Sequence, residues 1–123
     1  MNYDLLKEMY EIIERRRVEQ EEGSYTAFLF NEGLDKILKK LGEEATETII
    51  AAKSLEAIRN AGNNNIEVEK AKEALEGEAG DVLYHLVVLL DYLGIEVGEL
   101  EDLMRERMKV RRNLKDYSAR RDL

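Results

Sequence analysis

Four carboxylates of this sequence recur in pairs at the spacing of one helical turn. Glu44 and Glu47 form the first pair, and Glu78 and Asp81 form the second. Residues three apart lie on one face of an α-helix, so two such helices packed antiparallel would bring four acids together. Carboxylates that close repel one another unless cations lie among them. All-oxygen ligands favour a hard ion such as Mg²⁺, so the pairs indicate metal-assisted hydrolysis of a phosphoanhydride.

A plainer interpretation of these acids is a solvated helix face. Helical angles favour the metal site, because the first pair borders the apolar stripe of its helix and the second stands where the next helix becomes strongly apolar. A di-iron centre of the helical-bundle type is excluded, since it requires two Glu-x-x-His pairs and this chain has a single histidine, His85.

The elements expected to position the acids are about four main helices, with no convincing strand. Apolar residues at three- and four-residue spacing predict them over residues 4–17, 34–60 and 67–93, and from 97 into the C-terminal tail. Ser24 is expected to cap a helical turn over 26–30, followed by a break at 31–33. The Asn-rich stretch 61–65 is the clearest loop, and Gly94 suits a helix end. We therefore predict an all-α, antiparallel helical bundle.

Composition and charge fit one acidic domain over residues 1–123. The net charge of −8 combines a basic tail, over about 104–123, with a strongly acidic body, which argues against nucleic-acid binding. We expect the tail to be a solvated helix end, and a contact with a phosphate stays open. The absence of cysteine favours a reducing cytoplasm, and the N-terminal residues lack the apolar core of a signal peptide. No apolar run is long enough for a membrane span.

The segment Val82–Leu90 is hydrophobic nearly all round. A helix of this kind is normally buried on every side. A chain of 123 residues buries only a modest core by itself, so it covers such a helix poorly. We therefore expect homodimerisation to complete the bundle around this helix, and a higher oligomer stays open.

Longer strings around the acids resemble a known family. The pattern Glu-Glu-x-x-Glu followed by Glu-x-x-Asp resembles that of the all-α nucleoside triphosphate pyrophosphohydrolases, the MazG-like superfamily. Within it, three strings in order resemble the phosphoribosyl-ATP pyrophosphatases: GSYTAFLF at 23–30, GLDKILKKLGEEATE at 33–47 and DVLYHL at 81–86. The resemblance covers about residues 5–103. It implies Mg²⁺-dependent hydrolysis of phosphoribosyl-ATP, between its α and β phosphates, to phosphoribosyl-AMP and pyrophosphate in histidine biosynthesis.

The resemblance also implies roles for the acids. The residues expected to bind Mg²⁺ are Glu44, Glu47, Glu78 and Asp81. Glu43 is expected either to support these ligands or to act as the base for water, and the catalytic acids are Glu43, Glu44 and Glu47.

Other polar residues are candidates for binding the nucleotide substrate. The lysines proposed for the polyphosphate are Lys36, Lys39 and Lys40, of which helical angles direct Lys36 and Lys40 toward the acids and Lys39 toward the surface. Ser24, Tyr25 and Thr26 belong to a loop motif expected to contact the substrate. His85 has two interpretations, a buried residue that holds Asp81 in place or a direct contact with the substrate.

Thirty residues separate Glu47 from Glu78, which is more than is usual in the family, so we expect an extended helical hairpin. The two acid pairs face each other only if both helices of this hairpin are longer by the same number of residues. Two other functions stay open: a housekeeping nucleotide pyrophosphatase with the same metal site, and a non-enzymatic dimeric helical module. The Ser-Tyr-Thr string favours the histidine-pathway enzyme over the first, and the acid pairs argue against the second.

Overall fold

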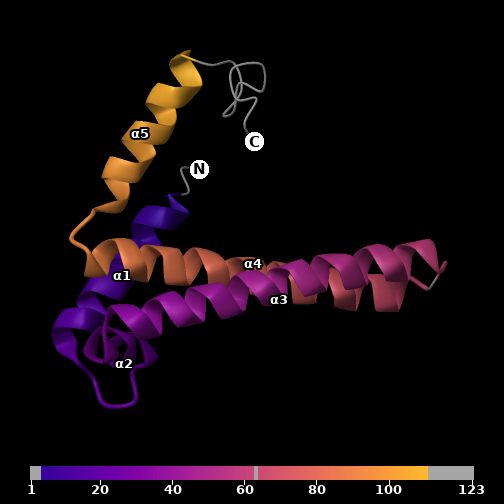
Figure 1. The fold of residues 1–123 in the computed structure, drawn as a ribbon, viewed down its shortest axis with the longest axis horizontal. Helices are drawn as coiled ribbons and strands as arrows, with labels where there is room; N and C mark the ends of the chain where they lie inside the picture. Colours follow the sequence, from indigo (N-terminus) through magenta and orange to yellow (C-terminus); the bar gives the residue numbers. More distant parts are fainter. Residues whose placement is uncertain (1–3, 63, 111–123) are drawn as a thin grey trace.

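The computed structural model describes residues 4–62 and 64–110. These residues form five helices and no strand, which confirms the all-α prediction. The helices are α1 (Leu5–Glu19), α2 (Tyr25–Glu32), α3 (Leu34–Asn60), α4 (Asn65–Tyr92) and α5 (Val97–Val110) (Figure 1). Within the part of the chain described, no helix is both long and apolar enough to cross a membrane. The predicted basic tail lies mostly outside the described residues.

Three of the helices begin at a short polar side chain. At each N-cap a side-chain oxygen accepts a backbone N–H at 3.0–3.1 Å, in Asp4, Ser24 and Asn64. The predicted cap at Ser24 is therefore confirmed, but α2 runs further than the expected turn. The break between α2 and α3 is consequently Gly33 alone, rather than 31–33. Its φ of +97° is a backbone conformation that favours glycine.

Helices α3 and α4 lie side by side as a long antiparallel hairpin (Figure 1). Helices α1 and α2 pack against one end of this hairpin, and α5 extends away from the same end. No helix of the described residues covers the other end, where α3 ends at Asn60 and α4 begins at Asn65. The extended hairpin expected from the long spacing between the acid pairs is therefore present.

The hydrophobic core lies where all five helices meet. Every helix contributes at least one fully covered side chain to it: Ile13, Leu29, Ile37, Val87, Val88 and Val97. Toward the free end of the hairpin, Leu55 is the buried apolar residue among those described. Since the driving force of folding follows apolar burial, the stability of the described chain is concentrated at the end that carries α1 and α2.

A partly buried ionic cluster joins α1 to α4 beside this core. The Arg17 guanidinium donates to the backbone oxygen of Asp91 at 2.9 Å and lies 3.4 Å from the Asp91 carboxylate. It also lies over the Phe30 ring, 4.7 Å from the ring centroid. One carboxylate oxygen each of Glu14 and Asp91 is buried without a hydrogen-bond donor among the described residues. Burial, with Glu14 nearby, raises the pKa of Asp91 to about 7.

The Asp91 carboxyl predicts a pH-dependent stability. In the unfolded chain an aspartate has a pKa of about 4, so between that pH and about 7 the folded protein binds the extra proton. Unfolding therefore releases a proton in this window, and stability falls as the pH rises. We expect the free energy of unfolding to drop by roughly 1–2 kcal/mol more in the wild type than in Asp91→Asn between pH 5 and 8, in urea titrations.

The matched control is Asp102→Asn, because the Asp102 side chain on α5 is 82% exposed. This variant should keep the wild-type slope of stability against pH. Glu14→Gln should flatten the slope only in part, since the amide no longer repels the Asp91 carboxylate but burial still raises its pKa. An unchanged slope in both cluster variants would mean that Asp91 is ionised throughout the range.

Candidate active site

The two arms of the hairpin are matched in length around the acids. Glu47 lies thirteen residues before the end of α3, and Glu78 lies thirteen residues after the start of α4. With a rise of about 1.5 Å per residue, both stand about 20 Å from the turn, at the same level. The extra length of the hairpin is thus shared equally, which keeps the acid pairs in facing register.

Three of the predicted ligands converge at this level. Carboxylate oxygens of Glu44, Glu47 and Glu78 all lie within 4.8 Å of one another. Glu44 is buried, Glu78 is half-buried and Glu47 is exposed, so the cluster is open to solvent on one side. A group that enters from solvent therefore reaches oxygens that are otherwise shielded by the two helices.

The cluster carries more negative charge than its surroundings neutralise. One oxygen each of Glu44 and Glu78 is buried without a hydrogen-bond donor in the described chain. Hydrogen bonding with Glu47, partial burial and the neighbouring Glu44 raise the pKa of Glu78 to about 7. Glu78 therefore binds a proton more readily than a free glutamate when no cation is near. Unpartnered oxygens in a crowded, all-oxygen cluster fit a divalent hard cation.

The fourth predicted ligand, Asp81, lies beside this cluster rather than within it. It lines a cavity of about 480 Å³ together with Glu44. The other residues that line this cavity are Arg16, Tyr25, Lys40, Tyr84 and His85. Carboxylates of both helices therefore face a space of the size of small-molecule sites, with two cations and three rings around it.

Of the three predicted lysines, Lys40 reaches the acids. Its ammonium lies 3.0 Å from Glu43 and 3.9 Å from Glu44. The hydrogen bond from Lys40 lowers the pKa of Glu43, and the same bond raises the pKa of Lys40. The Lys36 ammonium instead lies 5.9 Å from the centroid of the Phe28 ring on α2, so the structure does not bring it to the cavity. Lys39 is exposed, as the helical angles predicted.

The only histidine, His85, is buried and uses both ring nitrogens. Its Nδ1 lies 2.7 Å from the backbone oxygen of Asp81 and its Nε2 lies 2.9 Å from the Tyr25 hydroxyl. Because a carbonyl oxygen only accepts, Nδ1 carries the proton, and in the neutral ring Tyr25 donates to Nε2. His85 therefore ties α2 to the turn of α4 that carries Asp81, which agrees with the first interpretation of this residue.

The motif Ser24, Tyr25 and Thr26 separates into three roles. The Ser24 hydroxyl is occupied by the cap of α2, although the residue lines a neighbouring cavity. Tyr25 lines both cavities, and burial raises the pKa of its hydroxyl. Thr26 is 1% exposed and hydrogen-bonds the Tyr84 hydroxyl, so it lies beneath the site rather than in contact with a substrate.

Sequence reasoning missed two residues of the cavity. The first is Arg16, one of three consecutive arginines, and the second is Tyr84, which belongs to the apolar segment Val82–Leu90. The position of Tyr84 three residues after Asp81 was a usable signal, since that spacing shares a helix face. For Arg16 no such signal exists, because its place depends on how α1 crosses the hairpin.

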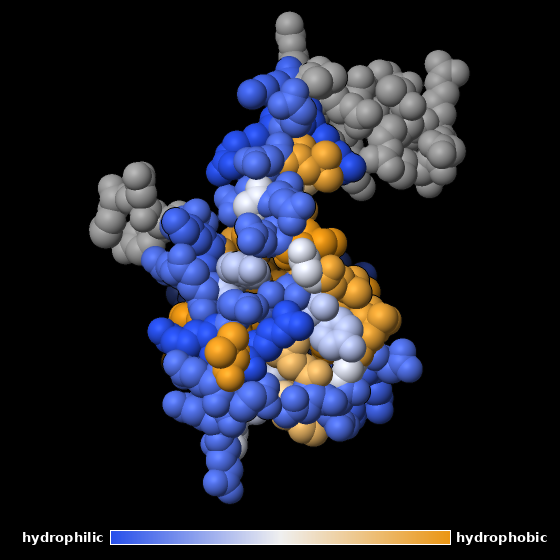
Figure 2. Space-filling view, turned by 90° about the vertical axis from the view of Figure 1, so that its left-hand side faces the viewer, coloured by the Kyte–Doolittle hydropathy of each residue, from blue (hydrophilic) through white to orange (hydrophobic). Residues whose placement is uncertain are grey.

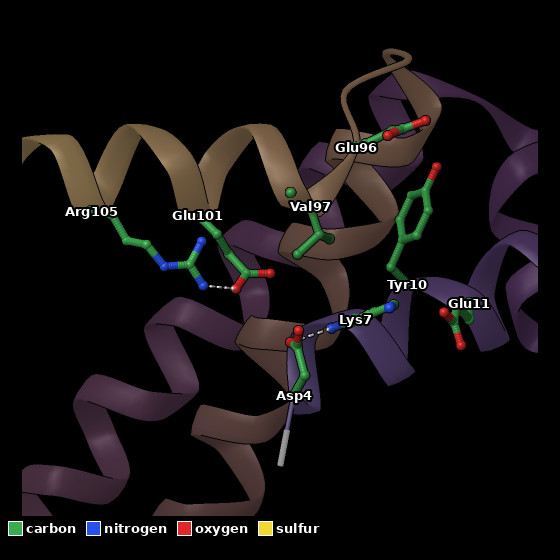
Figure 3. A pocket seen from close by; sticks show the side chains of 9 residues that line it. Asp4, Lys7, Tyr10, Glu11, Glu96, Val97, Glu101 and Arg105 are labelled. Carbon is green, nitrogen blue, oxygen red and sulfur yellow. Dashed lines mark hydrogen bonds and ion pairs between the residues drawn. The ribbon is translucent and has the colours of Figure 1, made fainter. Parts of the chain in front are cut away.

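A further cavity, of about 380 Å³, lies apart from these two, between α1 and the start of α5 (Figure 3). It is lined by both cations and acids, and its Arg105 is already paired with Glu101 at 3.1 Å. In the described residues, the acid cluster that fits a metal lies elsewhere, on α3 and α4. The cavity above that cluster is therefore the candidate active site.

Comparison with known proteins identifies the family of the chain. A family model described as phosphoribosyl-ATP pyrophosphohydrolase matches residues 6–109. A phosphoribosyl-ATP pyrophosphatase of Pelotomaculum thermopropionicum is 45% identical over 107 residues, which are 86% of this chain and 94% of that protein. A phosphoribosyl-ATP pyrophosphatase of Listeria innocua is 42% identical over 119 residues, 97% of each chain. The histidine biosynthesis bifunctional protein HisIE of Bacillus subtilis is 40% identical over 105 residues, 85% of this chain and 43% of that protein.

Proposed function

This chain belongs to the phosphoribosyl-ATP pyrophosphohydrolase family, and from that premise we propose that it hydrolyses phosphoribosyl-ATP to phosphoribosyl-AMP and pyrophosphate in histidine biosynthesis. The observation that carries the proposal is the cluster of Glu44, Glu47 and Glu78, with unpartnered oxygens beside a cavity of suitable size. A cytoplasmic location is proposed with it, supported by the cysteine-free sequence.

The residues proposed to hold Mg²⁺ are Glu44, Glu47 and Glu78, with Asp81 beside them. When bound there, the ion supplies positive charge for phosphate oxygens and lowers the pKa of water. Lys40 adds a fixed positive charge at the same edge of the cavity. Glu43 accepts the hydrogen bond of Lys40 and so orients this lysine, which supports a positioning role rather than that of the base.

The remaining residues of the cavity are proposed to orient the nucleotide. The hydrogen bonds of His85 fix the Tyr25 hydroxyl over the cavity, and Thr26 does the same for Tyr84. Their rings offer flat apolar surface, while the acids and Lys40 offer charge in the same cavity. Such a division suits a ligand with a ring system and a polyphosphate.

The test is pyrophosphate release by the purified protein with phosphoribosyl-ATP and Mg²⁺, measured against orthophosphate. ATP, dATP and dCTP are run in parallel. Rapid release of pyrophosphate from phosphoribosyl-ATP, and little from the others, is the expected result. Equal release from the ordinary nucleotides would favour the housekeeping pyrophosphatase, and no release from any substrate would favour the non-enzymatic module.

We also propose that two copies of the chain associate through the hairpin. Large apolar side chains stand exposed on α3 and α4: Leu38, Ile49, Ile50, Leu83 and Leu86. Figure 2 shows further apolar surface gathered on one side of the end that carries α1 and α2, continuing onto α5. Exposed apolar area of this kind is typical of a protein interface. A second hairpin packed on the first would complete a four-helix bundle.

Sedimentation equilibrium at micromolar concentration should therefore give at least twice the chain mass of 14.2 kDa. The double variant Ile49→Glu, Ile50→Glu should shift the protein toward monomer, because each charge would have to be buried without a partner. Val18→Glu, at an equally exposed apolar position on α1, is the control. A wild type that sediments only as a monomer would contradict the proposal.

A further inference from the structure

Arg16 on α1 stands where two cavities adjoin. It lines the cavity above the acids and also a neighbouring one of about 290 Å³, formed with the turn between α1 and α2. Tyr25 is the other residue that lines both. A ligand longer than the first cavity would therefore pass between Arg16 and Tyr25 into the second.

Arg16 differs from the neighbouring cations in having no carboxylate partner among the described residues. Lys40 is held by Glu43 and Glu44, and Arg17 is held by Asp91. Across the described residues, no carboxylate lies within 4.0 Å of the Arg16 guanidinium. Its five donors are thus available at the cavity wall, and a planar guanidinium suits two-point binding of a phosphate.

In the neighbouring cavity of about 290 Å³, binding of an anionic ligand depends on Arg16. Apart from Arg16, its charged lining consists of Glu21 and Glu22. A phosphate placed there without Arg16 would meet two carboxylates and no cation from the lining. Loss of Arg16 would therefore remove the attraction between the guanidinium and the phosphate, and the repulsion from Glu21 and Glu22 would remain.

We propose that Arg16 binds a phosphate at the end of the substrate remote from the polyphosphate, and so selects a nucleotide that carries such a second phosphate. This inference rests on the proposed function, which assigns the polyphosphate to the acids and Lys40. Phosphoribosyl-ATP carries such a second phosphate on the ribose that is attached to its base, whereas ATP has no phosphate at that end. Arg16 is then a determinant of specificity and does not touch the phosphoanhydride that is cleaved.

The experiment compares Arg16→Ala and Arg16→Lys with Arg15→Ala. Arg15 is exposed on the same helix and lines neither of the two cavities. Binding of phosphoribosyl-AMP and of AMP is measured by calorimetry, and KM and kcat are measured for phosphoribosyl-ATP. Circular dichroism verifies that each variant keeps its helices.

Arg16→Ala should weaken phosphoribosyl-AMP binding and raise KM by about 10- to 100-fold, the effect of losing a hydrogen-bonded charge. Binding of AMP and kcat should change less than about threefold, and Arg16→Lys should recover part of the affinity. Arg15→Ala should match the wild type. Equal losses for AMP and phosphoribosyl-AMP, or no loss for either, would overturn the inference. Turnover of phosphoribosyl-ATP by the wild type tests the proposed function separately. If the proposed function is wrong, the wild type itself shows no turnover, before any variant is compared.

Discussion

Replacing Glu44 by Gln is expected to lower kcat/KM for phosphoribosyl-ATP by at least roughly 10²- to 10³-fold, the loss seen when one preorganised electrostatic group is removed from an active site. Glu44 is buried, and one of its oxygens has no donor among the described residues. The amide keeps the size of the side chain but removes the negative charge and replaces one oxygen by an N–H donor group. A site built to hold a cation by charge would lose one of its three converging ligands.

The fold should survive this substitution. Removing one charge from three crowded carboxylates relieves repulsion, so the melting temperature without metal should not fall. Glu56→Gln on the same helix is the matched control, because the Glu56 side chain is 66% exposed and pairs only with Lys53 among the described residues. Pyrophosphate release at the wild-type rate by Glu44→Gln would overturn the site assignment, whereas a variant with lost helicity would be replaced by Glu47→Gln at the exposed side of the cluster.

Removing divalent cations is expected to abolish turnover and to lower the melting temperature. Three carboxylates within 4.8 Å are mutually repulsive, and a cation bound among them stabilises the folded state that brings them together. At a free Mg²⁺ concentration of 100 times Kd the gain is about 2.7 kcal/mol. For a chain of this size this corresponds to a rise of roughly 10 °C in Tm, which differential scanning fluorimetry resolves.

The control for this effect is salt alone. NaCl at matched ionic strength screens charge but does not occupy the cluster, so it should shift the melting temperature much less than Mg²⁺. Glu44→Gln should lose most of the Mg²⁺-dependent rise, which ties the effect to this site. A wild type whose stability and turnover are the same in EDTA and in Mg²⁺ would show that the carboxylates do not form a metal site.

Much of the fold was predictable because its signals are local. The span Leu34–Asn60 was predicted to the residue, since Gly33 and the Asn-rich loop mark its ends. The cap at Ser24 was predicted for the same reason. Errors were confined to helix ends: α2 continues past the expected break, and α4 begins two residues early, at Asn65. Frayed ends depend on packing as much as on sequence.

The acid cluster was also predictable, because two rules of chain geometry suffice for it. Spacing of three places Glu44 with Glu47 on one helix face. The predicted helix bounds make the two arms equal to within two residues, which brings Glu78 close to the level of Glu47, and the start of α4 at Asn65 makes them equal. Neither rule requires knowledge of side-chain packing elsewhere in the molecule.

The tertiary structure alone decided what surrounds the acids. Helical angles directed both Lys36 and Lys40 toward them, yet α2 packs so that Lys36 lies over Phe28 and only Lys40 reaches the acids. The crossing of α1 brings Arg16 to the cavity. It also buries Asp91 of α4 against Arg17. Periodicity fixes positions within one helix, but contacts between helices depend on crossing angles set by the whole core, which no local pattern in the sequence encodes.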